Sequence, residues 1–356
     1  MNHETRVQRM MFPQSNQSLQ AFGMYTDAEK YLWIAWLMVI LIVSVAGNLT
    51  VLIGSIRYNA IQLNKVTTTL VIHTAISDLG LIFTTIPTMI SLIMDTLVYG
   101  ETYCEIFTWI NGLFVRSSCL LVTAISCSKL ANIIWPFKSS CWTKRRGNKV
   151  AIAVWVVAVI LICFKALSKH IAASETILMP STLSCVAKIT EKLSIASTIL
   201  SVESLLSRAV PMTIVVITAL WLLAKVYIRQ KVFQGVQQIH RRVKLPGVIA
   251  VLAIVAVFIF SFAPLYCMIV YQLLQDTQKK HTYLLQMIRW FNNLAYLNCM
   301  LNVFIYSVTF KTFNIFVTRK VIPFLLPCRR TKRRIGLELM PLNRISKVHV
   351  IHEAPF

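Results

Sequence analysis

Seven long stretches without charged side chains restrict what this chain can fold into. The chain has 356 residues, of which 56% are hydrophobic and 14% are charged, and its mean hydropathy is +0.66. A soluble core cannot hide so large an apolar fraction, so the sequence indicates a membrane protein. Most of the stretches exceed the roughly 20 residues that a helix needs to cross a bilayer. They are Leu32–Ile56, Val66–Met94, Ile106–Ser128, Val150–Phe164, Leu193–Ala224, Leu245–Leu274 and Trp290–Phe310.

We therefore expect an all-α membrane protein built as a bundle of seven transmembrane helices, because only helices or closed barrels satisfy the backbone inside lipid. The fourth stretch is the weakest candidate, since Lys165 follows only fifteen uncharged residues. Its long side chain can nevertheless reach the membrane interface. A transporter or channel with seven spans is an alternative, but the chain lacks the internal repeats of many transporter folds.

The positions of lysine and arginine set the expected orientation, because cytoplasmic loops carry the excess of these residues. Ten follow the seventh stretch. Two short connections carry further groups: Lys144, Arg145, Arg146 and Lys149 after the third stretch, and Lys225, Arg229, Lys231, Arg241, Arg242 and Lys244 between the fifth and sixth. These segments share one side, which places the N-terminus outside. We interpret the net charge of +23 as a signal for this topology and for contact with anionic lipid at the inner face, not for nucleic-acid binding.

The segments outside the bundle divide the chain further. We expect an extracellular tail over residues 1–30, the seven-helix domain over 31–308, an interfacial amphipathic helix over 309–327 and a basic cytoplasmic tail over 328–356. The tail at the N-terminus has no signal-peptide pattern, so the first span is expected to act as its own insertion signal. Asn16 begins a glycosylation sequon, and glycosylated and unmodified forms are equal expectations. Cys328, beside a run of basic residues, is a candidate for palmitoylation, with a free cytosolic thiol as the alternative.

Polar side chains occur inside three of the expected helices. Asp78 lies in the middle of the second stretch, where an ionisable group is costly enough to indicate a functional site. Asn298, Asn302 and Tyr306 recur every four residues and so form one polar stripe on the seventh helix. Asn48 lies in the first. These residues predict a polar centre inside the bundle.

In position and spacing this centre resembles that of rhodopsin-like (class A) G-protein-coupled receptors. The matching residues are Asn48, Asp78, Ser118, Asn298 and Asn302. Trp155, Pro211 and Pro264 also fall where the family has its landmark tryptophan and prolines, so the resemblance runs from about Leu32 to Phe324. It implies a pocket for Na⁺ and water at Asp78, Ser118 and the two seventh-helix asparagines. Carboxylate, hydroxyl and amide oxygens suit such a cation, but a hydrogen-bonded core without an ion is the alternative.

Three activation motifs depart from the family pattern. Ser128-Lys129-Leu130 stands in place of Asp-Arg-Tyr, Phe262 replaces the tryptophan two residues before Pro264, and Val303 replaces the proline of the motif that ends at Tyr306. Lys244 occupies the position of an acid that restrains the arginine in some relatives. No restraining ion pair can form, and lysine lacks the planar fork of arginine. We therefore expect either appreciable signalling without ligand or weak coupling to a G protein.

Cysteines and charges mark the outer end of the bundle. Cys104 and Cys185 lie on the oxidising side, and the resemblance implies that they form a disulfide; two free thiols are the alternative. The candidate ligand-binding residues are Asn111, Arg116, Glu203, Ser207, Arg208, Arg289 and Tyr296. An ion pair between Arg116 and Glu203 would leave Arg208 or Arg289 for an anionic or carbonyl-bearing ligand, although purely structural pairing is an equal alternative.

The resemblance also limits the ligand and the partners. Asn111 stands in place of the aspartate that holds an amine, and Tyr296 in place of the lysine that holds retinal, so neither a monoamine nor retinal is expected. The sequence contains no pattern of an enzyme. We expect a plasma-membrane receptor that binds an extracellular ligand and activates a heterotrimeric G protein; a scavenger or accessory subunit without coupling is the alternative. Thr318, Thr331 and Ser346 are the only hydroxyls after Phe313, so arrestin recruitment should be weak.

Overall fold

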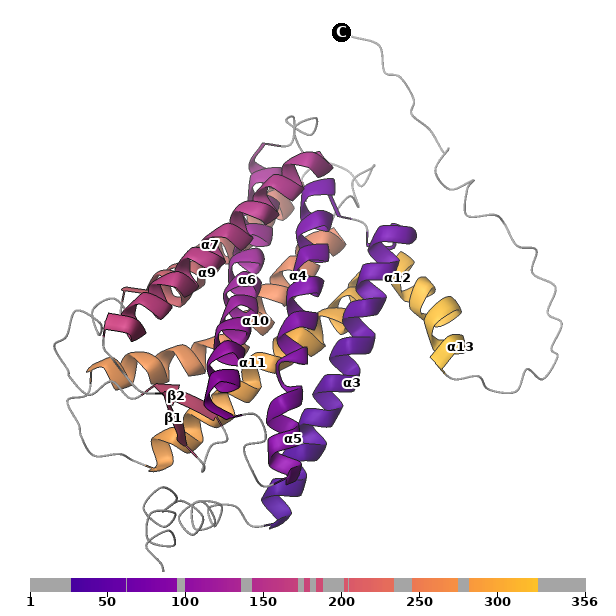
Figure 1. Ribbon diagram of the computed structural model, residues 1–356. Coiled ribbons are helices and arrows are strands. Elements are labelled where there is room, and N and C mark those ends of the chain that lie inside the picture. Colours follow the sequence, from indigo (N-terminus) through magenta and orange to yellow (C-terminus); the bar gives the residue numbers. More distant parts are fainter. Residues whose placement is uncertain are drawn as a thin grey trace, which may run out of the picture.

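In the computed structural model, the protein is a bundle of long helices (Figure 1). The described residues are 27–61, 63–94, 100–135, 143–171, 176–179, 184–187, 202–203, 205–233, 245–274 and 282–325. The longer elements are α3 (Asp27–Arg57), α4 (Lys65–Phe83), α6 (Gly100–Ile134), α7 (Lys144–Ile171), α9 (Val210–Phe233), α10 (Leu245–Leu274) and α11 (Thr282–Thr309). The shorter ones are α5 (Ile86–Met94), β1 (Thr176–Met179), β2 (Ser184–Ala187), η2 (Leu205–Ala209), α12 (Lys311–Phe316), η3 (Val317–Val321) and α13 (Ile322–Leu325).

The seven-span bundle predicted from the sequence is confirmed. Within the described residues, six helices are long and apolar enough to cross a membrane, and a seventh span is reached when Tyr296–Thr309 is counted with the bent segment Lys311–Val321. The bend between these two segments is 103°. The fourth span, which the sequence left weakest, is complete, because α7 extends through Lys165 to Ile171.

Helix α6 occupies the centre of the bundle. It contacts α4, α7, α9 and α10, and its Leu121, Val122 and Ile125 are buried in the core. By contrast, α7 exposes apolar side chains such as Ile152, Val156 and Ile160 along its outer side. Such a stripe would be a liability in water but is what a lipid-facing helix presents. The core therefore surrounds α6, and the polar sites below are built on this helix.

The second span is broken, although the sequence predicted one stretch from Val66 to Met94. Helix α4 ends at Phe83, and α5 starts at Ile86. Pro87 has no N–H to donate to the carbonyl four residues earlier, so the helix cannot continue unchanged through this point. The hydroxyls of Thr84 and Thr85 donate to the carbonyls of Leu81 and Ile82 at 2.6 and 2.7 Å, which satisfies the end of α4.

A small antiparallel hairpin was missed by the all-α prediction, which holds for the membrane-spanning part. Strand β1 pairs with β2 in the register Thr176↔Ala187 to Met179↔Ser184, and both strands lie against α6. The run Thr176–Met179 is rich in β-branched and long apolar residues, which suits a strand. Its shortness, and the dominance of helical stretches elsewhere, hid it in the sequence.

A short helical segment follows the bend after Thr309, as the sequence predicted. Phe310, Phe313 and Phe316 are buried against the bundle, whereas Lys311 and Asn314 on the opposite side are exposed. The Phe316 ring packs 4.9 Å from that of Tyr58 at the end of α3. This amphipathic packing is the expected one; the position of the helix at the membrane interface and the four sequence segments remain predictions.

Candidate functional site

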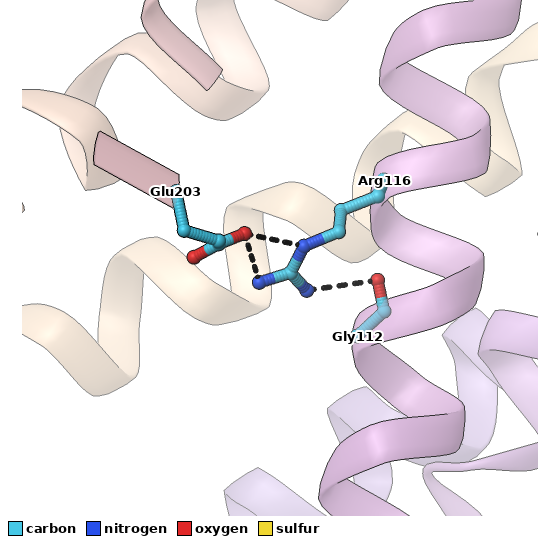
Figure 2. A network of polar contacts seen from close by, with 3 residues as sticks. All are labelled: Gly112, Arg116 and Glu203. Carbon is cyan, nitrogen blue, oxygen red and sulfur yellow. Dashed lines mark hydrogen bonds and ion pairs between the residues drawn. The ribbon is translucent and has the colours of Figure 1, made fainter. Parts of the chain in front are cut away.

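A buried ion pair joins α6 to the start of the fifth span. Arg116 of α6 donates from Nε to Glu203 Oε1 at 2.6 Å, and its Nη2 lies 2.5 Å from the same oxygen. The side chains are only 3% and 4% exposed. Figure 2 shows the guanidinium between this carboxylate and the Gly112 carbonyl, which accepts from Nη1 at 3.0 Å. The ion pair that the sequence analysis considered is therefore present, and its part in ligand binding stays a prediction.

Gly112 makes room for this arrangement. A Cβ at this position would lie 2.7 Å from Arg116 Nη1, so any larger residue would displace the guanidinium. The arginine thus folds back along its own helix by one turn while it reaches across to Glu203. The position of the Arg116 guanidinium therefore depends on the Gly112 carbonyl, which accepts its hydrogen bond, and on the absence of a side chain at Gly112.

The fifth span carries the partner side of this unit. Pro211 cannot donate to the carbonyl of Ser207, and the turn around it widens into the π-helical segment η2. Glu203 and Ser207 lie four residues apart and are both buried, and η2 contacts α6. Among the described residues, Ser207 Oγ has no hydrogen-bond partner. Arg208 follows on the same segment, and its charge interacts with those of Arg116 and Glu203.

Asn111 and Tyr296 meet at a second point of the outer half. Asn111 Nδ2 donates to Thr84 Oγ1 at 2.7 Å and to Tyr296 Oη at 3.4 Å, so it ties α6 to the break in the second span and to α11. Five residues of α6 correspond to about 500°, which places Asn111 and Arg116 on different faces of that helix. The described candidate ligand residues thus form two polar groups. Asn111 and Tyr296 make up one, and Arg116, Glu203, Ser207 and Arg208 make up the other.

The predicted polar centre is assembled around Asp78. Ser118 Oγ of α6 donates to Asp78 Oδ1 at 3.0 Å, and Asn302 Nδ2 of α11 donates to Oδ2 at 2.8 Å. Asn48 Nδ2 donates to the carbonyls of Ser44 and Cys299 at 3.0 and 2.9 Å, which links α3 to α11. One carboxylate therefore joins α4, α6 and α11, with Asn48 bonded beside it.

Amide atoms of the two α11 asparagines lack protein partners within the described residues. Asn298 is 1% exposed, and neither its Nδ2 nor its Oδ1 is hydrogen-bonded within the described part of the chain; the same holds for Asn302 Oδ1. Buried polar atoms are normally paired, so such orphans indicate an unseen water or ion. Carboxylate, hydroxyl and amide oxygens are the ligands of a hard cation, so these residues fit Na⁺ with water.

The altered triplet lies at the inner end of α6. The hydroxyls of Ser128 and Thr67 share a hydrogen bond of 3.0 Å, which links α6 to α4. Lys129 is 5% exposed and Leu130 is also buried. Tyr306 is buried beside Phe313, and Phe262 packs 4.9 Å from Phe258 on α10, the helix that also contains Pro264. Lys244 lies outside the described residues.

Sequence reasoning missed the uncharged partners of these groups. Thr67 and Thr84 bond to predicted residues, and His73 Nδ1 lies 3.4 Å from Trp155 Nε1, which joins α4 to α7. Threonine is common in membrane helices and bonds to its own backbone, so its presence alone gives no signal.

Other predicted residues lie wholly or partly outside the description. Cys104 belongs to α6, Cys185 to β2 and Arg289 to α11, but their side chains are not described, so the disulfide and the role of Arg289 stay predictions. Asn16 and Cys328 fall outside the described ranges.

The fold and these polar centres define a multi-pass membrane protein of the seven-helix class. The sequence matches the family described as 7 transmembrane receptor (rhodopsin family) over residues 47–306. Because this match covers most of the chain, the protein belongs to the rhodopsin family of seven-transmembrane receptors. Its members are receptors and not enzymes, in agreement with the sequence analysis.

Similar proteins include a cholecystokinin receptor of Xenopus laevis, 30% identical over 140 residues that make up 38% of this chain and 30% of the relative. The gastrin/cholecystokinin type B receptor of Rattus norvegicus is 27% identical over 139 residues, or 38% of this chain and 30% of the relative. An alpha-1A adrenergic receptor of Oryzias latipes is 27% identical over 125 residues, or 35% and 26%. The matches thus span less than a third of these receptors.

The structure of squid rhodopsin is similar to this one, with a TM-score of 0.68 at 17% sequence identity. The matched region covers 87% of this chain and 85% of the rhodopsin chain, which shows the shared fold.

Proposed function

We propose that the protein is a plasma-membrane receptor that binds an extracellular ligand in the outer half of the bundle and activates a heterotrimeric G protein. The observation that carries this proposal is the buried Asp78 carboxylate, bonded to helices α6 and α11. An ionisable group at this depth is costly and marks function. Because three helices share it, a change in their relative positions must alter its bonds, which is how a ligand outside can shift the population of states inside.

The proposed ligand carries an anionic or carbonyl group. Arg116 and Glu203 offset each other's charge, and Arg208 on η2 adds a cation to the same electrostatic environment. The relatives are named for cholecystokinin, gastrin and an adrenergic ligand. Asn111 provides no carboxylate for an ammonium group and instead bonds to Thr84 and Tyr296, which supports the exclusion of a monoamine. Tyr296 has no amine for a retinal Schiff base.

Asp78, Ser118, Asn298 and Asn302 are the residues that would hold a sodium ion. The orphaned amide atoms of Asn298 and Asn302 support this assignment, because they lie buried without protein partners among the described residues. A hard cation bound there would offset the carboxylate charge in the low-dielectric interior. The side chains then keep α4, α6 and α11 in the arrangement observed.

The inner switch supports raised basal activity. The bond between Ser128 and Thr67 joins two neutral hydroxyls, and such a bond contributes about 0.5–1.5 kcal/mol, against about 1.5–3 for a bond to a charged group. A restraint built on Ser128 is therefore weaker than one built on an aspartate. We infer that the active arrangement is populated more without ligand than in relatives with the charged motif.

A receptor-like scavenger or accessory subunit is the second candidate, and the lysine at position 129 favours it, because lysine cannot make every contact of arginine. A ligand screen distinguishes the two functions if each compound is measured both by direct binding and by nucleotide exchange on a G protein. Binding accompanied by faster exchange supports the receptor. A compound that binds with high affinity but does not change nucleotide exchange on any G protein tested supports the scavenger.

A further inference from the structure

Exposed cations gather where α4 and α7 begin at the inner side of the bundle. Lys65 is the first residue of α4, and Lys144, Arg145 and Lys149 lie in the first two turns of α7; all four are exposed. Neither helix has an acidic residue in its first turn. We call these four residues the α4–α7 basic patch.

Close packing of the two helices brings the patch together. A Cβ on Gly147 would lie 2.9 Å from Thr69 Cβ and 3.2 Å from Val66 Cα, so α7 touches α4 directly at this glycine. Lys65 precedes Val66. Lys144 lies seven residues, or two helical turns, before the buried Ala151, which puts it on the side of α7 that faces α4. The two lysines thus flank the same helix contact.

The other half of the patch continues into the lipid-facing side of α7. Arg145 and Lys149 are four residues apart and share a face, and the exposed Ile152 and Val156 follow on that face. Cations at the helix start followed by exposed apolar residues mark the level at which lipid headgroups meet acyl chains. The patch is therefore placed at the inner membrane boundary.

No acidic residue occurs in the inner sequence segments that border the membrane helices, and Glu338 and Glu353 follow only farther along the C-terminal tail. The ranges 57–65, 129–149, 225–244 and 311–334 contain many lysines and arginines and no aspartate or glutamate. A partner for the patch must bring the negative charge itself, and one that carries several charges on a small group matches cations from two touching helices better than one that carries a single charge.

We propose that the α4–α7 basic patch binds the multiply phosphorylated headgroup of an inner-leaflet lipid, with the acyl chains along the exposed face of α7. The adjoining apolar stripe favours a lipid over a free phosphate compound, because it offers the chains a surface. This inference rests on the expected contact of the inner face with anionic lipid, and it assigns that contact to the α4–α7 basic patch. It does not depend on ligand or G-protein activity.

Native mass spectrometry of the purified full-length protein tests the site directly. Phosphatidylinositol 4,5-bisphosphate and phosphatidylserine are titrated separately, and the bound fraction is read from the mass of each adduct. We expect the bisphosphate lipid to bind more tightly. The triple variant K144Q/R145Q/K149Q should weaken its binding about tenfold or more, since each cation near the surface contributes roughly a fivefold factor.

The matched control removes three exposed cations elsewhere on the same side, in K311Q/R319Q/K320Q, and should weaken binding less than about threefold. The charge-preserving variant K144R/K149R should bind as the unchanged protein does, which separates loss of charge from loss of folding. Equal weakening in both glutamine variants would overturn the proposal, as would equal binding of both lipids. Soluble inositol trisphosphate that binds as tightly as the lipid would also overturn it. No G protein is present in this experiment. A failure of lipid binding therefore leaves the proposal of G-protein signalling intact, and an absence of signalling does not affect the lipid-binding result.

Discussion

At the scale of single residues, the Arg116–Glu203 pair has the largest energetic consequence. Two charges have been moved from water into the bundle, and their mutual contact and the Gly112 carbonyl compensate for part of the lost solvation. Removing one partner leaves the other charge buried alone. Replacing both by apolar residues of similar volume removes the solvation cost together with the attraction.

We therefore predict that Arg116→Ala lowers the melting temperature of the purified protein by about 10 °C, since breaking a buried pair costs about 3–5 kcal/mol. The paired variant R116M/E203L should recover most of that loss. If ligand responses survive in this pair variant, the contact is structural; if they disappear, it belongs to the ligand site. Equal melting temperatures for Arg116→Ala and the unchanged protein would contradict the assigned role of the pair.

A second prediction at this scale concerns Asp78. Replacing choline by sodium at about 0.15 M should raise the melting temperature of the unchanged protein, because a cation that binds only the folded state stabilises it. Asp78→Asn should abolish this sodium effect. Ser126→Ala, which changes a buried hydroxyl away from the carboxylate, serves as the control and should keep it. A sodium effect of equal size in Asp78→Asn would remove the proposed ion site.

At the scale of helices, the substitution of Val303 for proline is the most informative. Helix α11 is continuous from Thr282 to Thr309, and the Val303 N–H is the helical donor for the Cys299 carbonyl. Asn48 Nδ2 donates to that same carbonyl at 2.9 Å. The acceptor that a proline at position 303 would leave without a backbone donor thus already has a side-chain donor. Val303 also packs closely on Gly47, where a Cβ would lie 2.8 Å from Val303 Cγ1.

From this geometry we predict that Val303→Pro destabilises the protein by less than about 1 kcal/mol, although an interior proline usually costs about 3. Leu301→Pro is the matched control in the same helix, because among the described residues no side chain donates to the Leu297 carbonyl. Thermal unfolding of both variants gives the comparison. An equal loss of stability in the two would show that Asn48 does not compensate for the missing N–H.

The sequence predicted the helices because their signals are long and uniform, and it predicted the polar contacts wherever charge made them necessary. Asp78 and the Arg116–Glu203 pair are examples, since a charge inside lipid requires a partner. It did not predict the break at Thr84 and Thr85 or the hairpin of β1 and β2. Pro87 could have indicated the break, but prolines in membrane helices often produce only a kink. Partners such as Thr67 depend on how helices pack, which no single segment reveals.

At the scale of the whole molecule, three polar layers follow α6 from outside to inside. Arg116 bonds toward the fifth span, Ser118 toward Asp78, and Ser128 toward Thr67. The first two bonds involve charged groups, whereas the bond between Ser128 and Thr67 joins two neutral hydroxyls. The weaker bond of Ser128 is the physical basis for expecting exchange activity without ligand.

The measurement that tests this account most directly is nucleotide exchange on a purified heterotrimeric G protein by the reconstituted receptor, without any ligand. We predict exchange clearly above that of empty membranes. Ser128→Asp should lower it, because an aspartate can pair with Lys129 and bond more strongly to Thr67. Ser126→Ala is the control and should leave the rate unchanged. Exchange equal to empty membranes with every G protein tested, or a rate that Ser128→Asp does not reduce, would contradict the account.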